Sequence, residues 1–299
     1  MTEHGGAHRA GYVGLVGRAS VGKSTLLNRL VGHKLSITSP RPQTTRHRIL
    51  GVLTRPDTQL VFIDTPGLQT QPSGRLNKAL NRAAIEALES VDVIVPVVEA
   101  CRFGPEDRAV FAHLPRGRPA VLAINKVDTL ADKARLLPFI AEVSQLFPFE
   151  EVVPVSARTG RQVEDLISAI APHLPQGPAL YGEDDLTDRS ERFLAGEFLR
   201  EKLCRLLGAE LPYATAVEVE RFETAGNLRR IAASILVDKP GQKAIVIGAG
   251  GEKLKAIASQ ARQEMERLFG AKVHLEVWVR VKQRWAEDPT ILRRLGYEA

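Results

Sequence analysis

The first half of the chain alternates short apolar runs with amphipathic segments between residues 9 and 174. Apolar runs of strand length, separated by segments of helical spacing, are typical of a parallel sheet with crossover helices. The predicted strands cover residues 12–16, 60–63, 91–98, 119–124 and 151–155, and a further strand at 48–53 pairs antiparallel to 60–63. The predicted helices cover residues 23–31, 76–89, 105–114, 133–146 and 162–173. We therefore expect an α/β domain with a doubly wound, mostly parallel sheet.

The second half of the chain has a different pattern. Residues 172–178 contain three prolines and one glycine, which end the preceding helix and indicate a linker. After the acidic residues 181–188, the segment 189–207 has a broad apolar face at helical spacing, which we expect to be core rather than a membrane-lying surface. Two alternating segments, 214–222 and 229–237, predict a hairpin, followed by a helix at 252–269 and a strand at 273–281. We expect a first domain at 1–175, a linker at 176–188, and a smaller α+β domain with a C-terminal tail at 189–299.

Composition indicates an ordinary globular protein. The 299 residues are long for one domain, and the hydrophobic fraction is 44% with 25% charged residues. No run of about 18 apolar residues is present, so no transmembrane helix is predicted. The segment Met1–Arg9 lacks the apolar centre of a signal peptide. The two cysteines, Cys101 and Cys204, are expected to be buried free thiols, and together these features favour a reducing cytoplasm.

The net charge of +6 is unevenly distributed. Residues 1–180 hold 21 Lys and Arg against 16 Asp and Glu, which gives +5. Residues 181–220 hold 5 against 10, which gives −5, and residues 221–294 hold 15 against 8, which gives +7. A basic end suits nucleic acid or an acidic membrane surface, although it also suits an ordinary solvated face.

Residues 17–24 have the spacing of a phosphate-binding loop, G-x-x-x-x-G-K-[ST], between a predicted strand and a predicted helix. Glycines allow consecutive N–H groups to point at phosphate oxygens, and the helix N-terminus favours an anion. The lysine supplies a charge to the β- and γ-phosphates, and the serine hydroxyl can bind Mg²⁺. A glycine-rich turn that only caps a helix is the alternative, but the strand and the helix favour the loop. The candidate nucleotide-binding residues here are Gly17, Arg18, Ala19, Ser20, Val21, Gly22, Lys23, Ser24 and Thr25.

A second motif, Asp64-Thr65-Pro66-Gly67, directly follows the predicted strand 60–63. An acid at this position can hold Mg²⁺ through a water, and a glycine N–H can reach a γ-phosphate because no Cβ blocks the approach. A simple Pro-Gly turn is the alternative. The distance of about forty residues from Ser24 favours the nucleotide site, in which we include the next residue, Leu68.

A third motif predicts the base. Asn125-Lys126-Val127-Asp128 follows the strand at 119–124, and a carboxylate there can accept hydrogen bonds from guanine N1–H and N2–H₂. Adenine would leave that carboxylate unpaired, which costs several kcal/mol. Asn125 can bridge loops and Lys126 can lie along the ring. After the strand at 151–155, a backbone N–H of the segment Ser156-Ala157-Arg158 can reach guanine O6.

These motifs, in this order, resemble the TRAFAC-class P-loop GTPases. The resemblance implies that Pro42-Gln43-Thr44-Thr45-Arg46 is the first switch and that one threonine there ligates Mg²⁺, for which we favour Thr45 over Thr44. A flexible polar loop is the alternative, and the two are compatible. The expected catalytic residues are Lys23, Thr45 and Gly67, and the expected metal ligands are Ser24, Thr45 and Asp64.

Two departures from the class pattern concern hydrolysis. Leu68 stands where Ras-like proteins place a water-orienting glutamine, so we expect slow intrinsic turnover that a partner or a cation raises. Ser20 stands where relatives that use potassium usually carry asparagine. Because serine has a shorter reach and lacks the amide carbonyl, we do not expect potassium activation.

The second half resembles a type II KH domain, an RNA-binding fold. Its predicted order is helix, strand, strand, helix, helix, strand, with G-x-x-G at Gly248-Ala249-Gly250-Gly251 between the last two helices. Such a loop clamps a single-stranded backbone in KH domains, although a G-x-x-G can also be only a helix start. The variable pair carries no basic residue here, and the nearest are Lys253 and Lys255. Lys282, Arg284 and Trp285 follow the last strand and could stack on bases, with burial of Trp285 as a tail anchor as the equal alternative.

The combination closely resembles the Era family of bacterial GTPases over nearly the whole chain, including Gly-Leu after Asp64-Thr65-Pro66 and Leu295-Gly296-Tyr297. This resemblance implies a GTP/GDP switch with Mg²⁺ that binds small-subunit ribosomal RNA near its 3′ end and acts in assembly of the small ribosomal subunit. It implies a cytoplasmic protein with peripheral association at the inner face of the cell membrane, and we expect a monomer. Two alternatives stay open: a membrane-surface GTPase whose basic end binds anionic lipid, and a protein that holds GTP structurally without turnover.

Overall fold

The computed structural model describes residues 8–70, 72, 74–208 and 211–297. Its contacts divide the chain into two compact units. The first consists of residues up to 36 together with 45–72 and 80–188, and the second consists of 37–44, 73–79 and 189 onward. The segment 37–44 therefore packs with the second unit, although both of its sequence neighbours belong to the first.

The first unit is built on a six-stranded sheet with the order β2-β3-β1-β4-β5-β6. All neighbouring strands are parallel except β2, which is antiparallel to β3. The strands are β1 (Arg9–Val16), β2 (Ile49–Thr54), β3 (Thr58–Asp64), β4 (Val93–Glu99), β5 (Val121–Asn125) and β6 (Glu151–Pro154). This arrangement confirms the predicted fold class, with β2 as the one antiparallel strand of this sheet.

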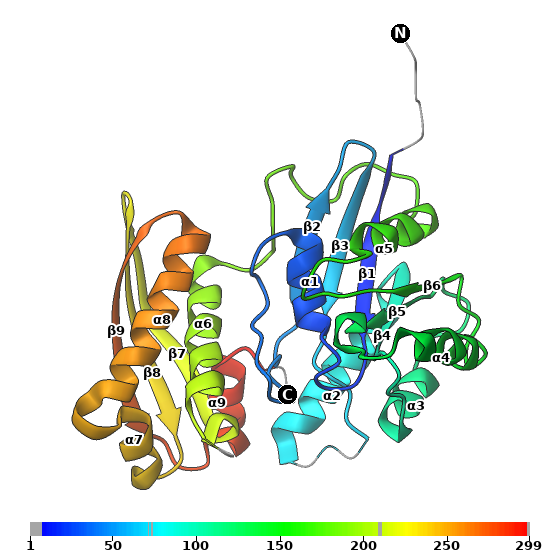
Figure 1. Ribbon diagram of the computed structural model, residues 1–299. Coiled ribbons are helices and arrows are strands. Elements are labelled where there is room, and N and C mark those ends of the chain that lie inside the picture. The colour runs from blue at the N-terminus through cyan, green and yellow to red at the C-terminus, as the bar shows by residue number, and fades with distance from the viewer. Residues whose placement is uncertain (1–7, 71, 73, 209–210, 298–299) are drawn as a thin grey trace. The chain divides into compact units, whose positions relative to one another are not determined.

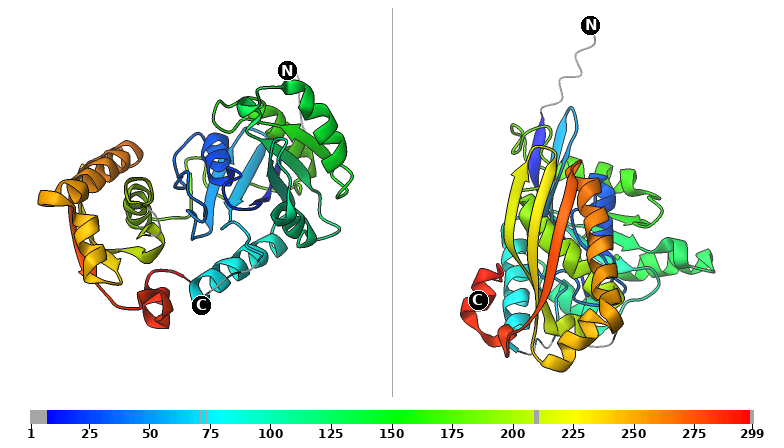
Figure 2. Two further views of the ribbon diagram at one scale, coloured as in Figure 1. Left: turned by 60° about the horizontal axis from the view of Figure 1, so that its bottom comes forward. Right: turned by 90° about the vertical axis from the view of Figure 1, so that its left-hand side faces the viewer.

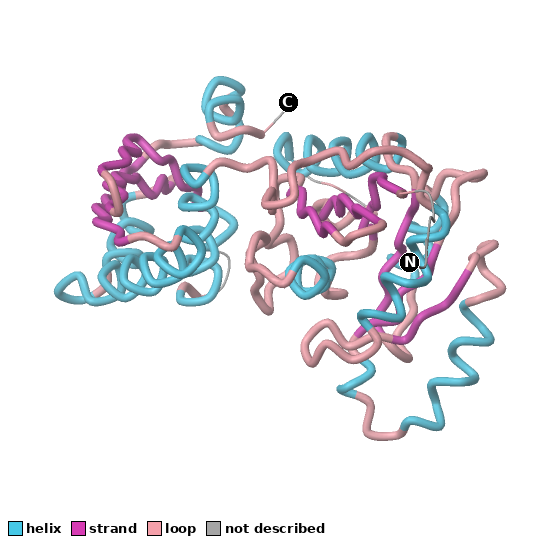
Figure 3. Tube along the Cα trace, turned by 90° about the horizontal axis from the view of Figure 1, so that it is seen from above, coloured by secondary structure: helices cyan, strands magenta, loops and turns pink. Residues whose placement is uncertain are grey.

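Helices lie on both sides of this sheet (Figures 1 and 3). They are α1 (Lys23–Val31), α2 (Gly74–Glu89), α3 (Pro105–Ala112), α4 (Leu136–Val143) and α5 (Val163–Ile170). Residues of α2, α3 and α4 share one apolar cluster with the central strands, whereas α1 packs beside α5. The central strands are continuous apolar runs because both of their faces are covered. The predicted helix at 133–146 divides into a 3₁₀ turn at Lys133–Arg135 and α4.

The second unit is a three-stranded sheet covered by helices. Strand β7 (Thr215–Ala225) is antiparallel to β8 (Leu228–Val237), and β8 is parallel to β9 (Lys272–Val281). The helices are α6 (Glu191–Leu206), α7 (Pro240–Ile247), α8 (Glu252–Phe269) and α9 (Pro289–Arg294). Helices α6 and α8 pack side by side on this sheet and share its apolar cluster (Figure 2).

Helix α6 buries more than the apolar face that its spacing predicts. Phe198 and Leu203 lie in the core, but Glu197, Arg200, Glu201 and Lys202 are buried as well. The segment 37–44 accounts for part of this burial, because it packs on α6 and places Ile37 in the same apolar cluster. The spacing of α6 could not predict a covering segment that is so distant in the sequence.

Both cysteines are free thiols, Cys204 buried and Cys101 partly buried. Among the described residues, no helix is both long and apolar enough to cross a membrane.

Candidate nucleotide and nucleic-acid sites

The phosphate-binding loop connects β1 to α1 and has no room for side chains at its two glycines. A Cβ on Gly17 would lie 2.5 Å from the Val97 carbonyl oxygen. A Cβ on Gly22 would lie 2.4 Å from Asn125 Nδ2, and Gly22 has a φ of +103°, in the left-handed region. The loop is therefore packed against the carboxyl ends of β4 and β5, where ligands bind in parallel sheets.

Lys23 is buried beneath this loop, with 6% of its surface exposed. Its Nζ donates to the carbonyl oxygens of Gly17 at 2.8 Å and Arg18 at 3.0 Å. Burial lowers the pKa of Lys23 to about 8, although the Asp64 carboxylate opposes this shift. A buried ammonium held by loop carbonyls is a strong anchor for a phosphate oxygen, because the dielectric constant there is low.

Three oxygen-bearing side chains meet next to the lysine. Ser24 Oγ donates to Asp64 Oδ2 at 2.6 Å and lies 2.7 Å from Thr45 Oγ1. Asp64 is fully buried, burial raises its pKa, and Oδ1 has no hydrogen-bond partner among the described residues. Hydroxyl and carboxylate oxygens with one unsatisfied acceptor fit Mg²⁺, which binds hard oxygen ligands.

Thr44 and Thr45 differ in their surroundings. The Thr45 hydroxyl belongs to the oxygen cluster, whereas Thr44 Oγ1 bonds Ser39 Oγ at 2.6 Å and donates to the Arg41 carbonyl at 2.9 Å. The geometry therefore brings Thr45 to Ser24 and turns Thr44 toward its own segment.

The residues after Asp64 lie against the phosphate-binding loop. A Cβ on Gly67 would lie 2.8 Å from the Ala19 backbone nitrogen, so this approach requires glycine. Leu68 is 7% exposed and forms a parallel β-bridge with Arg18. Thr65 Oγ1 donates to the Leu15 carbonyl, and Pro66 is buried. The structure thus brings the second motif to the first, with an apolar side chain at position 68.

The third motif lies beside the loop. Asn125 Nδ2 donates to the Val21 carbonyl at 2.9 Å, and its Oδ1 accepts from the backbone N–H groups of Lys126 and Ala157. Asp128 accepts from Ser156 Oγ at 2.6 Å and Arg158 Nε at 2.8 Å. These contacts, the serine hydrogen bond first, lower the pKa of Asp128 and keep it ionised as an acceptor.

Two residues at this site, Glu99 and Arg29, were not predicted from the sequence. Glu99, at the end of β4, accepts from Lys126 Nζ at 2.8 Å and pairs with Arg18 at 3.3 Å. Burial works against ionisation of Glu99, but Lys126 and Arg18 outweigh it and lower the pKa. A signal existed for Glu99, since it ends a strand at the ligand edge of the sheet.

The second residue that the sequence did not predict is Arg29 of α1, which forms hydrogen bonds with the backbone of the segment Ser156-Ala157-Arg158. Its Nε donates to the Ala157 carbonyl at 3.2 Å and its Nη2 to the Arg158 carbonyl at 2.6 Å. The guanidinium also lies 3.6 Å from the position of a Cβ on Gly160. No sequence signal marked Arg29, because an arginine on a helix is ordinarily a solvated charge.

The G-x-x-G loop of the second unit lies between α7 and α8. Gly248, Gly250 and Gly251 all have a φ between 56° and 80°. Ala249 and Gly250 are exposed, and a Cβ on Gly250 would meet nothing within 4 Å. Lys255 is exposed and Lys253 partly buried. This loop therefore presents backbone to solvent, as a nucleic-acid clamp requires.

The prediction that Trp285, in the segment after β9, stacks on nucleic-acid bases is wrong. Trp285 is 1% exposed and its Nε1 donates to the Ala214 carbonyl at 3.1 Å, so it is the tail anchor and its ring is not available to stack on bases. Lys282 and Arg284 are exposed, and Arg284 pairs with Glu287 at 2.8 Å. A tryptophan beside basic residues could not be assigned from sequence because the packing of the tail was unknown.

Comparison with known proteins agrees with both units. Residues 12–126 match the family described as 50S ribosome-binding GTPase, and residues 210–286 match the KH domain. The chain is 53% identical to the GTPase Era of Nitrosomonas eutropha, covering 97% of this chain and 98% of that protein. It is also 53% identical to the GTPase Era of Xanthomonas axonopodis pv. citri over the full length of both.

Solved structures agree over the same extent. A variant of Aquifex aeolicus Era bound to GDP·AlF₄⁻ superposes with a TM-score of 0.93 at 37% identity, covering 97% of this chain and all of that one. A structure of Era in complex with MgGDPNP and nucleotides 1506–1542 of 16S ribosomal RNA superposes with a TM-score of 0.92 at 38% identity, covering 98% and 100%. The chain therefore belongs to the Era family, and it is a GTPase with a KH domain after its GTP-binding domain.

Proposed function

We propose that this chain is a GTP-driven switch that binds small-subunit ribosomal RNA near its 3′ end and acts in assembly of the small ribosomal subunit. The complex of a relative with 16S ribosomal RNA supports the choice of RNA. The exposed backbone of the G-x-x-G loop, with Lys253, Lys255, Lys282 and Arg284, supports an RNA contact on the second unit. Trp285 is excluded from these contacts because it is buried.

The observation that carries the switch proposal is the packing of residues 37–44 with the second unit. Arg200, itself 2% exposed, donates to the Thr44 carbonyl oxygen. Arg41 donates to the carbonyls of Cys204 at 2.8 Å and Leu207 at 2.6 Å. The Thr38 backbone N–H donates to Glu201 Oε1 at 3.0 Å. Side chains and backbone of α6 thus hold this segment at three points along its length.

The residue that follows this segment is Thr45, whose hydroxyl lies at Ser24. A γ-phosphate with Mg²⁺ orders such a threonine, and hydrolysis releases it. Thr45, which would respond to the nucleotide, therefore directly follows the segment 37–44, which packs with the second unit. This continuity supports a coupling between GTP and RNA, and such a coupling is reciprocal.

Within the GTP site we propose the following roles. Lys23 and the loop from Gly17 to Thr25 hold the phosphates, the Gly67 N–H contacts the γ-phosphate, and Asp128 selects guanine. Ser24 and Thr45 would hold Mg²⁺ directly and Asp64 would do so through a water; bound Mg²⁺ would neutralise charge on the phosphates. The buried, apolar Leu68 cannot orient a water, which supports slow intrinsic turnover raised by a partner.

We further propose domain boundaries at 175 and 189, a monomeric state, and a cytoplasmic location with peripheral association at the cell membrane. Ser20 supports turnover that does not depend on potassium, because its side chain lacks an amide carbonyl. Equal GTPase rates in potassium and sodium would agree with this assignment. A large stimulation by potassium would contradict it.

The RNA assignment is tested by crosslinking the purified protein to total cellular RNA with GTP or GDP present, followed by sequencing of the bound fragments. We expect fragments from the 3′ end of small-subunit ribosomal RNA, and a lower yield of them with K253A/K255A but not with the control R82E, on the first unit. Fragments spread evenly over all RNA would contradict the proposal. Binding to anionic vesicles without RNA, at physiological salt, would favour the membrane-surface alternative.

A further inference from the structure

A cluster of phenylalanine rings lies on the first unit, between α3 and the segment after α4. Phe103 and Phe111 have ring centroids 5.2 Å apart, Phe111 and Phe149 are 5.6 Å apart, and Phe149 and Phe147 are 5.4 Å apart. The chain has ten phenylalanines, so four of them form this one row. Only Phe111 is buried, whereas the other three are partly exposed.

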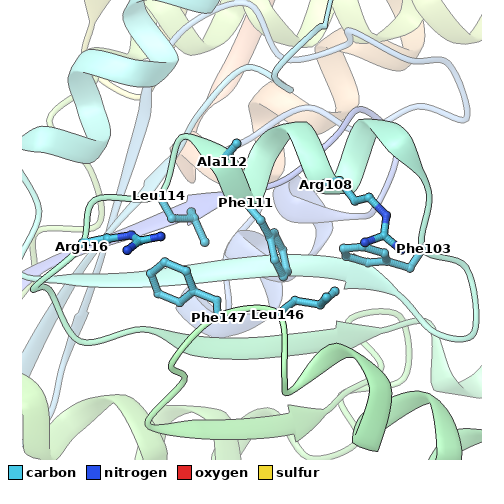
Figure 4. A pocket seen from close by; sticks show the side chains of 8 residues that line it. All are labelled: Phe103, Arg108, Phe111, Ala112, Leu114, Arg116, Leu146 and Phe147. Atoms are coloured by element: carbon cyan, nitrogen blue, oxygen red, sulfur yellow. The ribbon is translucent and has the colours of Figure 1, made fainter.

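Three of these rings, those of Phe103, Phe111 and Phe147, line a pocket of about 290 Å³ together with Leu114 and Leu146 (Figure 4). Phe111 lies at 9% exposure, and Leu146 is 37% exposed. Small-molecule pockets begin at roughly 300 Å³, so this volume suits one or two apolar side chains better than a cofactor. The lining residues are separate from the residues proposed to bind GTP or RNA.

Two cationic side chains flank the rings. The Arg108 guanidinium lies 5.5 Å from the Phe103 ring centroid, and Arg116 lies beyond Leu114 at the other end of the pocket (Figure 4). Both arginines are exposed, and neither pairs with a carboxylate within the part of the chain that the structure describes. An apolar pocket with unneutralised cations at both ends is complementary to an apolar group with anions on both sides.

We propose that this pocket binds an acidic peptide segment of a partner protein, which inserts one aromatic or leucine side chain among the phenylalanines. Carboxylates on either side of the inserted residue pair with Arg108 and Arg116. Aromatic anchors in pockets and arginine contacts carry much of the energy of protein interfaces. The same helix places Asp107 on Arg18 of the phosphate-binding loop at 3.1 Å, so the peptide would contact a helix that supports the GTP site.

Two other occupants fit less well. A small carboxylic acid has one anionic end and would leave the other arginine unpaired. A membrane surface takes up side chains that project from a protein, whereas these rings form a recess with Phe111 almost wholly buried. A peptide supplies both the projecting side chain and the two charges.

The test is selection from a random twelve-residue peptide library displayed on phage, with the GDP-loaded full-length protein as target. We expect enrichment of peptides with Phe, Trp or Leu flanked on both sides by Asp or Glu. A fluorescent copy of the most enriched peptide should bind R108E/R116E about tenfold or more weakly, because two charge-assisted contacts become repulsive. L146D should also weaken it, and the charge control R82E on α2 should not.

GDP affinity and circular dichroism establish that each variant is folded, since none of these residues contacts the nucleotide site. Enrichment of peptides without acidic residues, equal binding to R108E/R116E, or no enrichment at all would overturn the proposal. Loss of binding to anionic vesicles in R108E/R116E, without any enriched peptide, would assign the surface to lipid instead.

Discussion

The two glycine-rich loops that we propose to bind phosphates, residues 17–24 and 248–251, are built in opposite ways. In the loop 17–24, Lys23 is 6% exposed and the missing Cβ of Gly22 would lie 2.4 Å from Asn125 Nδ2. In the loop 248–251, Gly250 has open space around it, and the nearby Lys255 is exposed. The first loop is enclosed by the protein, and the second is open to solvent.

This difference separates two kinds of recognition. Buried charges act at a low dielectric constant and are expensive to leave unpaired, so each contact in the first loop has a large, salt-insensitive effect. Exposed lysines contact a backbone through screened interactions whose effects are small, additive and salt-dependent. We therefore expect substitutions at the GTP site to cause large, specific losses of nucleotide affinity. Substitutions in and beside the loop 248–251 should cause smaller, graded losses of RNA affinity.

The largest effect is expected for Asp128→Asn. The amide would present a donor to guanine N1–H, so GTP affinity should fall by roughly a thousandfold, while the xanthine nucleotide, with a carbonyl at C2, should gain affinity. Titration of both nucleotides measures the change. The control Asp132→Asn, at an exposed helix cap, should leave both affinities unchanged. Unaltered preference for GTP in Asp128→Asn would contradict the role of this carboxylate.

A matched pair of glycine substitutions probes the two loops directly. Gly22→Ala adds a Cβ in contact with Asn125 at a φ of +103°, so nucleotide affinity should fall by about a hundredfold. The added Cβ of Gly250→Ala meets no neighbour and costs only the strain of a φ of +56°, about 1–2 kcal/mol, so RNA affinity should fall by about thirtyfold at most. Equal losses in nucleotide and RNA titrations would remove the distinction between the loops.

Arg29→Ala should weaken GDP binding by about tenfold, because the segment 156–158, which we propose to face guanine O6, loses two hydrogen bonds that position it. The decisive readout is 2-aminopurine riboside diphosphate, which lacks O6. If Arg29 positions the O6 contact, affinity for this analogue should barely change. An equal loss for GDP and for the analogue would mean that Arg29 only stabilises the fold. The conservative Arg29→Lys should recover part of the GDP affinity.

The smallest effects are expected at the two lysines that follow the G-x-x-G loop. Lys253→Ala and Lys255→Ala should each weaken RNA binding only a few-fold, and should each reduce the slope of log affinity against log salt by about 0.7–1. Binding measured at four salt concentrations gives the slope. A large loss with no change in slope would indicate that the lysine makes a buried, specific contact instead.

Much of this architecture could be predicted from the sequence, because parallel strands buried on both faces are continuous apolar runs and the ligand loops follow them. The motifs at Lys23, Asp64 and Asp128 are local in sequence, and each follows a strand or precedes a helix as expected. Arg29 could not be found, because its partners are backbone carbonyls more than 120 residues away. Burial of Trp285 and the packing of residues 37–44 on α6 could not be predicted either, because both depend on contacts between segments that are distant in the sequence.

The most direct test of the switch is a closed set of six affinities: those of RNA for the GTP-analogue and GDP forms, and those of each nucleotide with and without RNA. We expect the nucleotide to change RNA affinity by at least fivefold and RNA to change the relative nucleotide affinity by the same factor. Arg41→Ala, which loosens the segment 37–44, should reduce both factors together while Arg82→Ala leaves them intact. Equal RNA affinity in the two nucleotide forms of the unaltered protein would contradict the switch.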